Sequence, residues 1–346
     1  MTALLNLLCL LLPLAMLPGL MSAGTTPRWA VLALLVPPML YWVDWEKVPH
    51  KRLLIATLVF AAFSLLWMEV RYDGYLELWR MTLIFSAFAV GAVCGNLERP
   101  LTLMAVSLAL TLPLVFFQAL GYQGIPQTAP PAGLFLNKNV LAESAAALLV
   151  AMTFLRRWHI AIPLLVITLL AQERAAYVGM TAAVILYLWP RRRSLAYALL
   201  ACIGVSVLVM SSTPSALDRF GIWQDTLQGV TWMGQGIGSF FTMFPATATH
   251  IDTMLVRPEQ AHNEFLHFLF ELGIGSAGLW ALGYFAIRGK QELERLVFAS
   301  IVAMSLFAFP FHMPLTAFLA ALVAGRLCSS ERDDVGFAVD GRSRHA

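Results

Sequence analysis

The chain has 346 residues, of which 59% are apolar and only 12% are charged, and its formal net charge is +3. Soluble globular domains carry about 25% charged residues, so this composition argues against a soluble fold. The basic residues stand in short polar stretches between apolar blocks rather than along one stripe, which argues against binding to nucleic acid.

Apolar blocks recur along the chain at the length of about 20 residues that a helix needs to cross a bilayer. Backbone polar groups inside a bilayer must be satisfied within the segment, so blocks of this kind are expected to be helices. The predicted spans lie near residues 3–22, 29–45, 53–69, 79–97, 101–120, 138–155, 159–172, 174–190, 195–212, 263–287, 294–310 and 312–328. The sequence therefore predicts an all-α, polytopic membrane protein of about twelve transmembrane helices. Residues 1–328 would form one membrane domain, and residues 329–346 a short, disordered tail.

The basic residues predict the orientation of these spans. With an even number of spans both termini lie on one side, and Lys and Arg are enriched in cytoplasmic loops. Sixteen of the 23 Lys and Arg residues fall on the side of the termini. The other seven are Arg28, Arg71, Arg80, Lys138, Arg174, Arg219 and Arg257. Both termini are therefore expected in the cytoplasm, and segment 213–262 is expected to be one large periplasmic loop.

This loop is the longest hydrophilic stretch between spans, and a helix is predicted within it. Ser212, Thr213 and Pro214 are typical of a helix start. Apolar residues then recur at helical spacing, at Leu217, Phe220, Trp223 and Leu227. The pattern predicts a short amphipathic helix lying at the membrane surface. Glycines at alternate positions from 234 to 238 end it.

Two arginines on the periplasmic side are candidates for binding an anion. Arg174 follows Glu173 in a loop of almost no length between two spans. Arg219 lies four residues before Trp223 on the amphipathic helix, so the two share a face. Arginine suits phosphate because its planar fork donates two parallel hydrogen bonds. The alternatives are a local ion pair that caps a helical hairpin for Arg174, and contact with lipid head groups for Arg219.

Polar residues also stand at the outer ends of two predicted spans. His262, Asn263 and Glu264 open the tenth span, and histidine is the side chain best suited to proton transfer near neutral pH. Asn137, Lys138 and Asn139 open the sixth span and could bind phosphate or sugar. Ordinary helix capping is the alternative for both groups. The outer loops contain no HxH, HExxH or DxD spacing, so no metal site is predicted.

Four of these stretches, in this order, resemble the superfamily of O-antigen ligases, O-antigen polymerases and protein O-oligosaccharyltransferases of bacterial inner membranes. Residues 133–142 are similar to the family's G-x-F-x-N-x-N-x-L-A segment, and Glu173-Arg174-Ala175 stands where the family usually has Ser-Arg and a small residue. Arg219 and Trp223 match an R-x-x-x-W motif that precedes alternating glycines. The fourth stretch is His262-Asn263-Glu264. The resemblance covers roughly residues 130–328, and Glu173 departs from its usual serine.

The resemblance implies a metal-independent glycosyltransferase without a cofactor. Its donor would be a saccharide on undecaprenyl diphosphate, and its acceptor a hydroxyl at the periplasmic face of the inner membrane. Arg174 and Arg219 would bind the diphosphate, and His262 would act as the general base. Lys138, Asn137, Asn139, Trp223, Asn263 and Glu264 would contribute to substrate binding.

The acceptor remains open at this point. It would be the lipid A core in an O-antigen ligase, which we favour, a second lipid-linked glycan in a polymerase, and a Ser or Thr of an exported protein in a protein O-oligosaccharyltransferase. A lipid-linked sugar flippase is the alternative from another class. Transporters often consist of two similar halves with charges at the bilayer midplane, whereas the charges here gather toward the outer face.

Overall fold

The computed structural model describes residues 1–20, 22–68, 70–125, 129–197, 199–200, 214–251 and 258–340. Within these ranges the chain is all-α, and turns, short 3₁₀ segments and one isolated β-bridge join the helices. The α-helices are α1 (Thr2–Leu11), α2 (Thr26–Met39), α3 (Lys51–Ser64), α4 (Arg71–Val93), α5 (Glu98–Ala109), α6 (Leu112–Ala119), α7 (Lys138–Phe154), α8 (Trp158–Ala171), α9 (Arg174–Leu188), α11 (Pro214–Gln228), α12 (Phe240–Thr247), α13 (Glu264–Leu272), α14 (Ser276–Ile287), α15 (Glu292–Met304) and α16 (Pro314–Asp340).

Several helices end where proline or glycine interrupts the apolar pattern. The first expected span, 3–22, is wrong as a continuous helix, because α1 ends at Leu11, two residues before Pro13. Proline disfavours the helical conformation of the residue before it. Gly273 ends α13 with a positive φ of 51°, and a 3₁₀ turn joins it to α14. Most of the expected span 195–212 lies outside the described residues.

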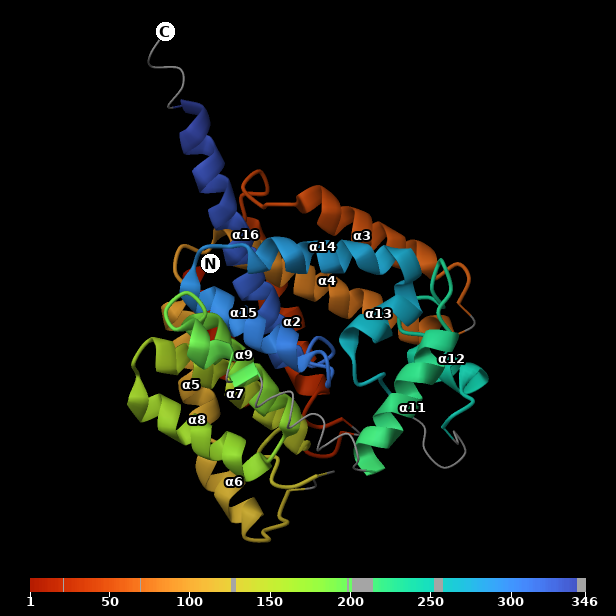
Figure 1. Cartoon of the computed structure of the whole chain (residues 1–346), viewed down its shortest axis with the longest axis horizontal. Helices are drawn as coiled ribbons and strands as arrows, with labels where there is room; N and C mark the ends of the chain where they lie inside the picture. Colours follow the sequence, from red (N-terminus) through yellow and green to blue (C-terminus); the bar gives the residue numbers. More distant parts are fainter. Residues whose placement is uncertain are drawn as a thin grey trace.

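The helices form one bundle around a shared apolar core. In Figure 1, α3, α4 and α14 lie side by side along one side, and α5, α6, α7 and α8 along the other. Helices α4 and α16 pack against each other through glycine. A Cβ added to Gly91 would lie 2.0 Å from the carbonyl oxygen of Leu322, and one added to Gly325 would lie 2.0 Å from that of Phe88. Small residues allow such close backbone approach between apolar helices.

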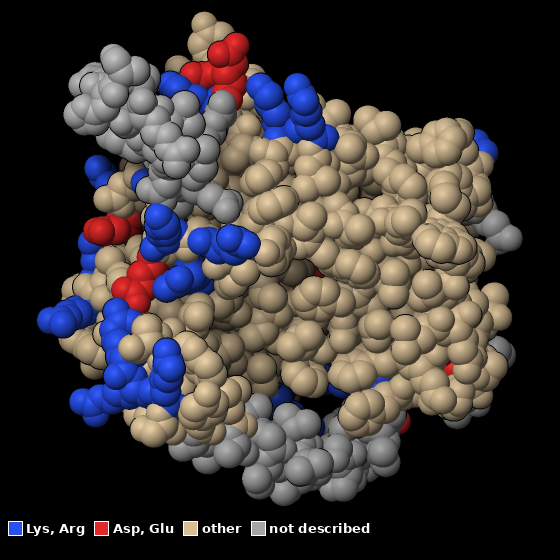
Figure 2. Space-filling model, turned by 45° about the horizontal axis from the view of Figure 1, so that its top comes forward, with Lys and Arg blue, Asp and Glu red and all other residues tan. Residues whose placement is uncertain are grey.

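Among the described residues, three helical segments are long and apolar enough to cross a membrane: Arg71–Val93, Glu98–Ala119 and Glu264–Ile287. Shorter apolar helices cover Thr2–Leu11, Trp158–Ala171, Arg174–Leu188 and Pro314–Ser329. Figure 2 shows a broad face with few charged side chains, while Lys and Arg gather along one edge. These features support membrane association, and the length criterion supports three of the expected twelve spans.

The segment expected to be the large outer loop contains two helices. A helix is confirmed there as α11, described over Pro214–Gln228, and its position at the membrane surface stays a prediction. The helix ends at Gln228, six residues before Gly234, so the expectation that Gly234, Gly236 and Gly238 end it is wrong; these glycines have positive φ angles in the loop that follows. At the other end of the chain, α16 continues as helix through Asp340, into the segment 329–346 for which we expected disorder. Residues 341–346 lie outside the described part.

Candidate active site

Helix α11 is fixed to the segment that precedes α13. The indole N–H of Trp223 donates a hydrogen bond to the carbonyl oxygen of Ala261, at 2.9 Å. The indole ring also packs against Phe307, which follows α15, with 6.0 Å between ring centroids. Arg219 lies one turn before Trp223, so these contacts hold the start of α11 beside His262. Two predicted site segments are thereby brought together from positions about 40 residues apart.

His262 occupies a restricted position at the start of α13. Its φ of 51° is left-handed, which is uncommon for a residue other than glycine, and its ring packs against Phe309 with 5.2 Å between centroids. Asn263 is the N-cap of α13. Its side chain accepts a hydrogen bond from the N–H of Leu266 at 3.1 Å and donates one to the carbonyl oxygen of Leu306 at 3.2 Å. The predicted binding residue Asn263 is thus used in capping and in anchoring the loop after α15.

The electrostatic surroundings keep His262 neutral. Burial lowers the pKa of its imidazole to about 4, and the electrostatic contributions of Arg219 and His267 act in the same direction. A neutral imidazole can accept a proton at pH 7, which a general base requires. The same contribution from Arg219 places the predicted cation within electrostatic range of the predicted base.

A buried carboxyl group on α7, which sequence reasoning missed, lies within electrostatic range of Arg219. Glu143, on α7, is 1% exposed and lies within electrostatic range of Arg219, Glu173 and Glu264. Within the described part of the chain its Oε2 atom has no hydrogen-bond partner. The signal was available in the sequence, because an ionisable residue within an apolar span is a functional candidate by default.

The carboxylate of Glu264, at the start of α13, contacts the loop between α15 and α16. Its Oε1 accepts a hydrogen bond from the backbone N–H of Phe311 at 2.7 Å, and its Oε2 lies 2.8 Å from Nδ1 of His312. One turn further along α13, Nε2 of His267 lies 3.2 Å from Oε1 of Glu271. Glu264 was predicted to bind substrate; here its carboxylate positions the loop. His312 and Glu271 were not predicted.

The polar residues before and at the start of α7 include its N-cap. Asn137 is the N-cap, and its side chain accepts a hydrogen bond from the N–H of Asn139 at 2.9 Å. Lys138 and Asn139 are half-buried, and the backbone N–H of Lys138 donates to the carbonyl oxygen of Ala129. Of this group, the capping role is observed for Asn137. The binding roles of Lys138 and Asn139 stay predictions.

A buried arginine holds the segment that leads into α7. Arg28 donates hydrogen bonds to the carbonyl oxygens of Leu12, at 3.1 Å, and Pro13, at 2.8 Å, and also to that of Gly24. Its guanidinium lies 3.8 Å from the centroid of the Phe135 ring. The sequence placed Arg28 among the residues of an outer loop, whereas it is 2% exposed.

Glu173 and Arg174 lie at the start of α9, which meets α7 and α15. Glu173 is the buried N-cap, and its side chain accepts a hydrogen bond from the N–H of Ala175 at 3.4 Å. Arg174 is exposed at the first helical position. Ala175 packs in one cluster with Ala142, and Phe307 borders this cluster. Because Phe307 also contacts Trp223, Arg174 lies at the same end of the bundle as Arg219.

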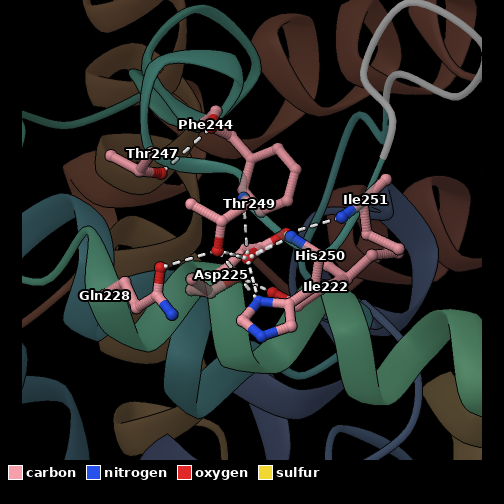
Figure 3. A network of polar contacts seen from close by, with 9 residues as sticks. Ile222, Asp225, Gln228, Phe244, Thr247, Thr249, His250 and Ile251 are labelled. Atoms are coloured by element: carbon pink, nitrogen blue, oxygen red, sulfur yellow. Dashed lines mark hydrogen bonds and ion pairs between the residues drawn. The ribbon is translucent and has the colours of Figure 1, made fainter.

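The loop after α12 is anchored to α11 by one carboxylate. Figure 3 shows Asp225 of α11 among the polar groups of residues 249–251. Its two oxygens accept hydrogen bonds from the backbone N–H groups of Thr249, His250 and Ile251, each at 3.0 Å. Burial opposes its negative charge, but hydrogen bonds from these residues outweigh that effect, so the pKa of Asp225 is below its ordinary value.

Two cavities meet beside the first turns of α13. The smaller, of about 220 Å³, has a mixed lining in which Glu77, Glu259 and Glu271 stand beside aromatic rings. The larger, of about 410 Å³, has mostly apolar walls from α4, α14 and α16. Glu77, Arg80, Glu271 and His312 line both.

The described residues contain no group of three or more His, Cys, Asp or Glu arranged to hold a metal ion. Comparison with protein-family models and with curated proteins finds no match for the chain. The family resemblance therefore rests on the motifs of residues 133–142, 173–175, 219–240 and 262–275 themselves.

Proposed function

We propose that this protein is a glycosyltransferase that moves a saccharide from undecaprenyl diphosphate to an acceptor hydroxyl at the outer face of the bacterial inner membrane. In this proposal about twelve helices cross the membrane, and both termini face the cytoplasm. The observation that carries it is the juxtaposition of Arg219 and a neutral His262, held together by the hydrogen bond from Trp223 to Ala261.

The transfer breaks the bond between the anomeric carbon of the sugar and a phosphate oxygen. The diphosphate leaves with the bonding electron pair, and its developing negative charge needs fixed cations nearby. Arg219 supplies one such cation, and Arg174, at the same end of the bundle, supplies a second. Lys138 is an additional cation at the start of α7.

The acceptor oxygen forms the new bond to the anomeric carbon. Its proton passes to the imidazole of His262, which is neutral at pH 7 because its pKa is about 4. The helix α11 that carries Arg219 and Trp223 covers the donor, and the polyprenyl chain lies among apolar helices.

A transfer assay in nanodiscs tests the reaction. Purified protein receives a lipid-linked oligosaccharide donor and, in parallel, the lipid A core, a second lipid-linked saccharide, or a pilin-like protein, with EDTA throughout. We expect transfer to one acceptor, and a loss of about 100- to 1,000-fold for Arg219→Ala. The control is Arg71→Ala, since Arg71 is an exposed arginine at the start of α4.

Absence of transfer to every acceptor, with folded protein and intact donor, contradicts the proposal. Movement of the lipid-linked donor between leaflets under the same conditions would instead identify a flippase. Retention of full activity by Arg219→Ala would remove this arginine from the mechanism.

A further inference from the structure

The smaller cavity beside α13 combines carboxylates with aromatic rings. Asp73, Glu77, Glu259 and Glu271 contribute to its lining, and so do the rings of Phe240 and Phe241. Carboxylate oxygens accept hydrogen bonds from hydroxyl groups, and an aromatic face packs against the apolar face of a sugar ring. Arg80, in contact with Glu77, is the one arginine in this lining. The lining therefore suits a ligand rich in hydroxyl groups better than a phosphate.

The larger cavity continues from this polar end into the apolar part of the bundle. Its walls include the side chains of Phe88 on α4, Leu282 on α14 and Ala321 on α16. Trp280 and Tyr284 also line it, and both are exposed on the surface of α14. A ligand of mixed character fits the pair of cavities, with its polar head at Glu77 and Glu271 and its chain along α14.

The polar cavity is coupled to the candidate base through one side chain. Nε2 of His267, which lines this cavity, lies 3.2 Å from Glu271, and its Nδ1 accepts a long hydrogen bond of 3.4 Å from the backbone N–H of Ala261. Ala261 directly precedes His262. His262 itself lines neither cavity, so the polar cavity is linked to the candidate base through His267 and the backbone of Ala261.

We infer that the two cavities form the acceptor site, and that the acceptor is a glycolipid rather than a protein. The carboxylate-lined cavity binds its saccharide, and the apolar cavity binds its lipid chain. This inference rests on the proposed function and specifies its acceptor class.

Two substitutions probe the two cavities separately. Gly283 lines the apolar cavity, and a Cβ built on it meets no other atom within 4 Å, so Gly283→Leu fills the cavity without a backbone clash. Gly95 has the same open surroundings and lines neither cavity, so Gly95→Leu is its control. Glu77→Gln removes one carboxylate from the polar cavity, and Glu98→Gln is its control on the surface of α5.

Direct binding is measured with a photoreactive probe. A dodecyl glucoside carrying a diazirine on its chain is irradiated with the protein in phosphatidylcholine nanodiscs, and labelled peptides are identified by mass spectrometry. We expect labelling of α4 and α14, reduced about tenfold or more in Gly283→Leu and Glu77→Gln and unchanged in both controls. Equal labelling of all variants overturns the inference. Competition by dodecylphosphocholine as effective as by dodecyl glucoside also overturns it and identifies a phospholipid site.

Kinetics then separate this inference from the proposed function. If both hold, Gly283→Leu and Glu77→Gln raise the KM for a glycolipid acceptor about tenfold or more and leave the KM for the donor unchanged. Transfer to the pilin-like protein with normal kinetics in both variants refutes the acceptor site but keeps the glycosyltransferase. Specific probe labelling without transfer to any acceptor refutes the glycosyltransferase and the acceptor role together, and leaves a glycolipid-binding site.

Discussion

The first third of the chain and the remainder bury different kinds of side chain. Within the described part of residues 1–132, Arg28 is the buried ionisable side chain other than cysteine. Residues 133–328 bury Glu143, Glu173, Asp225, Glu264, His267, Glu271, Glu294 and His312. Burying an ionisable group is costly unless it is paired, so such groups persist where they fix structure or serve function. Under the proposed function, the residues that bind the diphosphate and accept the proton lie in the remainder, and the first third contributes scaffold together with the α4 wall of the proposed acceptor site.

The sharpest test of this comparison is the replacement of His262. We expect His262→Ala to lower kcat about 100- to 10,000-fold, because the acceptor proton then has no base. His159→Ala is the control, since His159 is exposed on α8. The measurement is glycan transfer at saturating donor and acceptor, with protein amount and folding matched. Equal activity of the two variants would move the chemistry away from α13.

The pH dependence of the same reaction gives a second test. His262 must be neutral to act as a base, and its pKa of about 4 means that it stays neutral well below pH 6.5. We expect kcat/KM to rise with pH through about 4 and to be level near pH 7. An acid limb near 6.5, the ordinary value for histidine, would indicate a different base or an exposed His262.

For Arg28, in the first third of the chain, we expect replacement to lower stability and to leave activity unchanged. Arg28→Met leaves the carbonyl oxygens of Leu12 and Pro13 without their buried donor, so the free energy of unfolding should fall by about 2–3 kcal/mol. Transfer per folded molecule should stay close to the original level. The measurement is unfolding in mixed micelles, with the exposed Arg52→Met as control. A loss of transfer as large as that of His262→Ala would contradict the scaffold interpretation.

A smaller effect is expected at the loop after α12. Asp225→Asn places an amide among backbone N–H donors and should reduce stability by about 1–3 kcal/mol. Hydrogen exchange at residues 249–251 measures it directly. Asp218→Asn is the matched control, because Asp218 is exposed on the same helix. Unchanged protection in Asp225→Asn would show that the loop is held by other contacts.

The smallest effect is the acid sensitivity of this loop. The pKa of Asp225 is lower in the folded chain than in the unfolded chain, so the unfolded chain binds more protons as the pH falls past about 4. The stabilisation is complete above that pH and is lost as the pH falls through the lowered pKa. Protection of residues 249–251 should decrease there in the original protein, while Asp225→Asn should show no such step.

Local patterns in the sequence predicted local structure well. Apolar residues at helical spacing between 217 and 227 predicted a helix in this segment, and α11 spans it, although it ends at Gln228, before the glycines expected to end it. Capping was the alternative offered for Asn137 and Asn263, and both are N-caps. Such features depend on residues three or four positions apart, which a single sequence records directly.

Partners far apart in the chain could not be predicted in the same way. Glu264 and His312 meet across a separation that no helical period encodes, and Arg28 is buried by carbonyl groups that carry no side-chain signature. In the sequence Glu143 is one polar residue in an apolar run, and only the fold places it within electrostatic range of Arg219. The motifs predicted which segments meet, but which side chains hold them depends on packing.

The glycine contact between α4 and α16 has a consequence for the larger cavity. A Cβ at Gly91 or Gly325 would collide with backbone atoms of the facing helix, so α4 and α16 can keep this close spacing only with glycine at both positions. Both helices also line the larger cavity, α16 through small alanine side chains. Substitution of either glycine would therefore move α4 and α16 apart and widen the wall that these two helices form in that cavity.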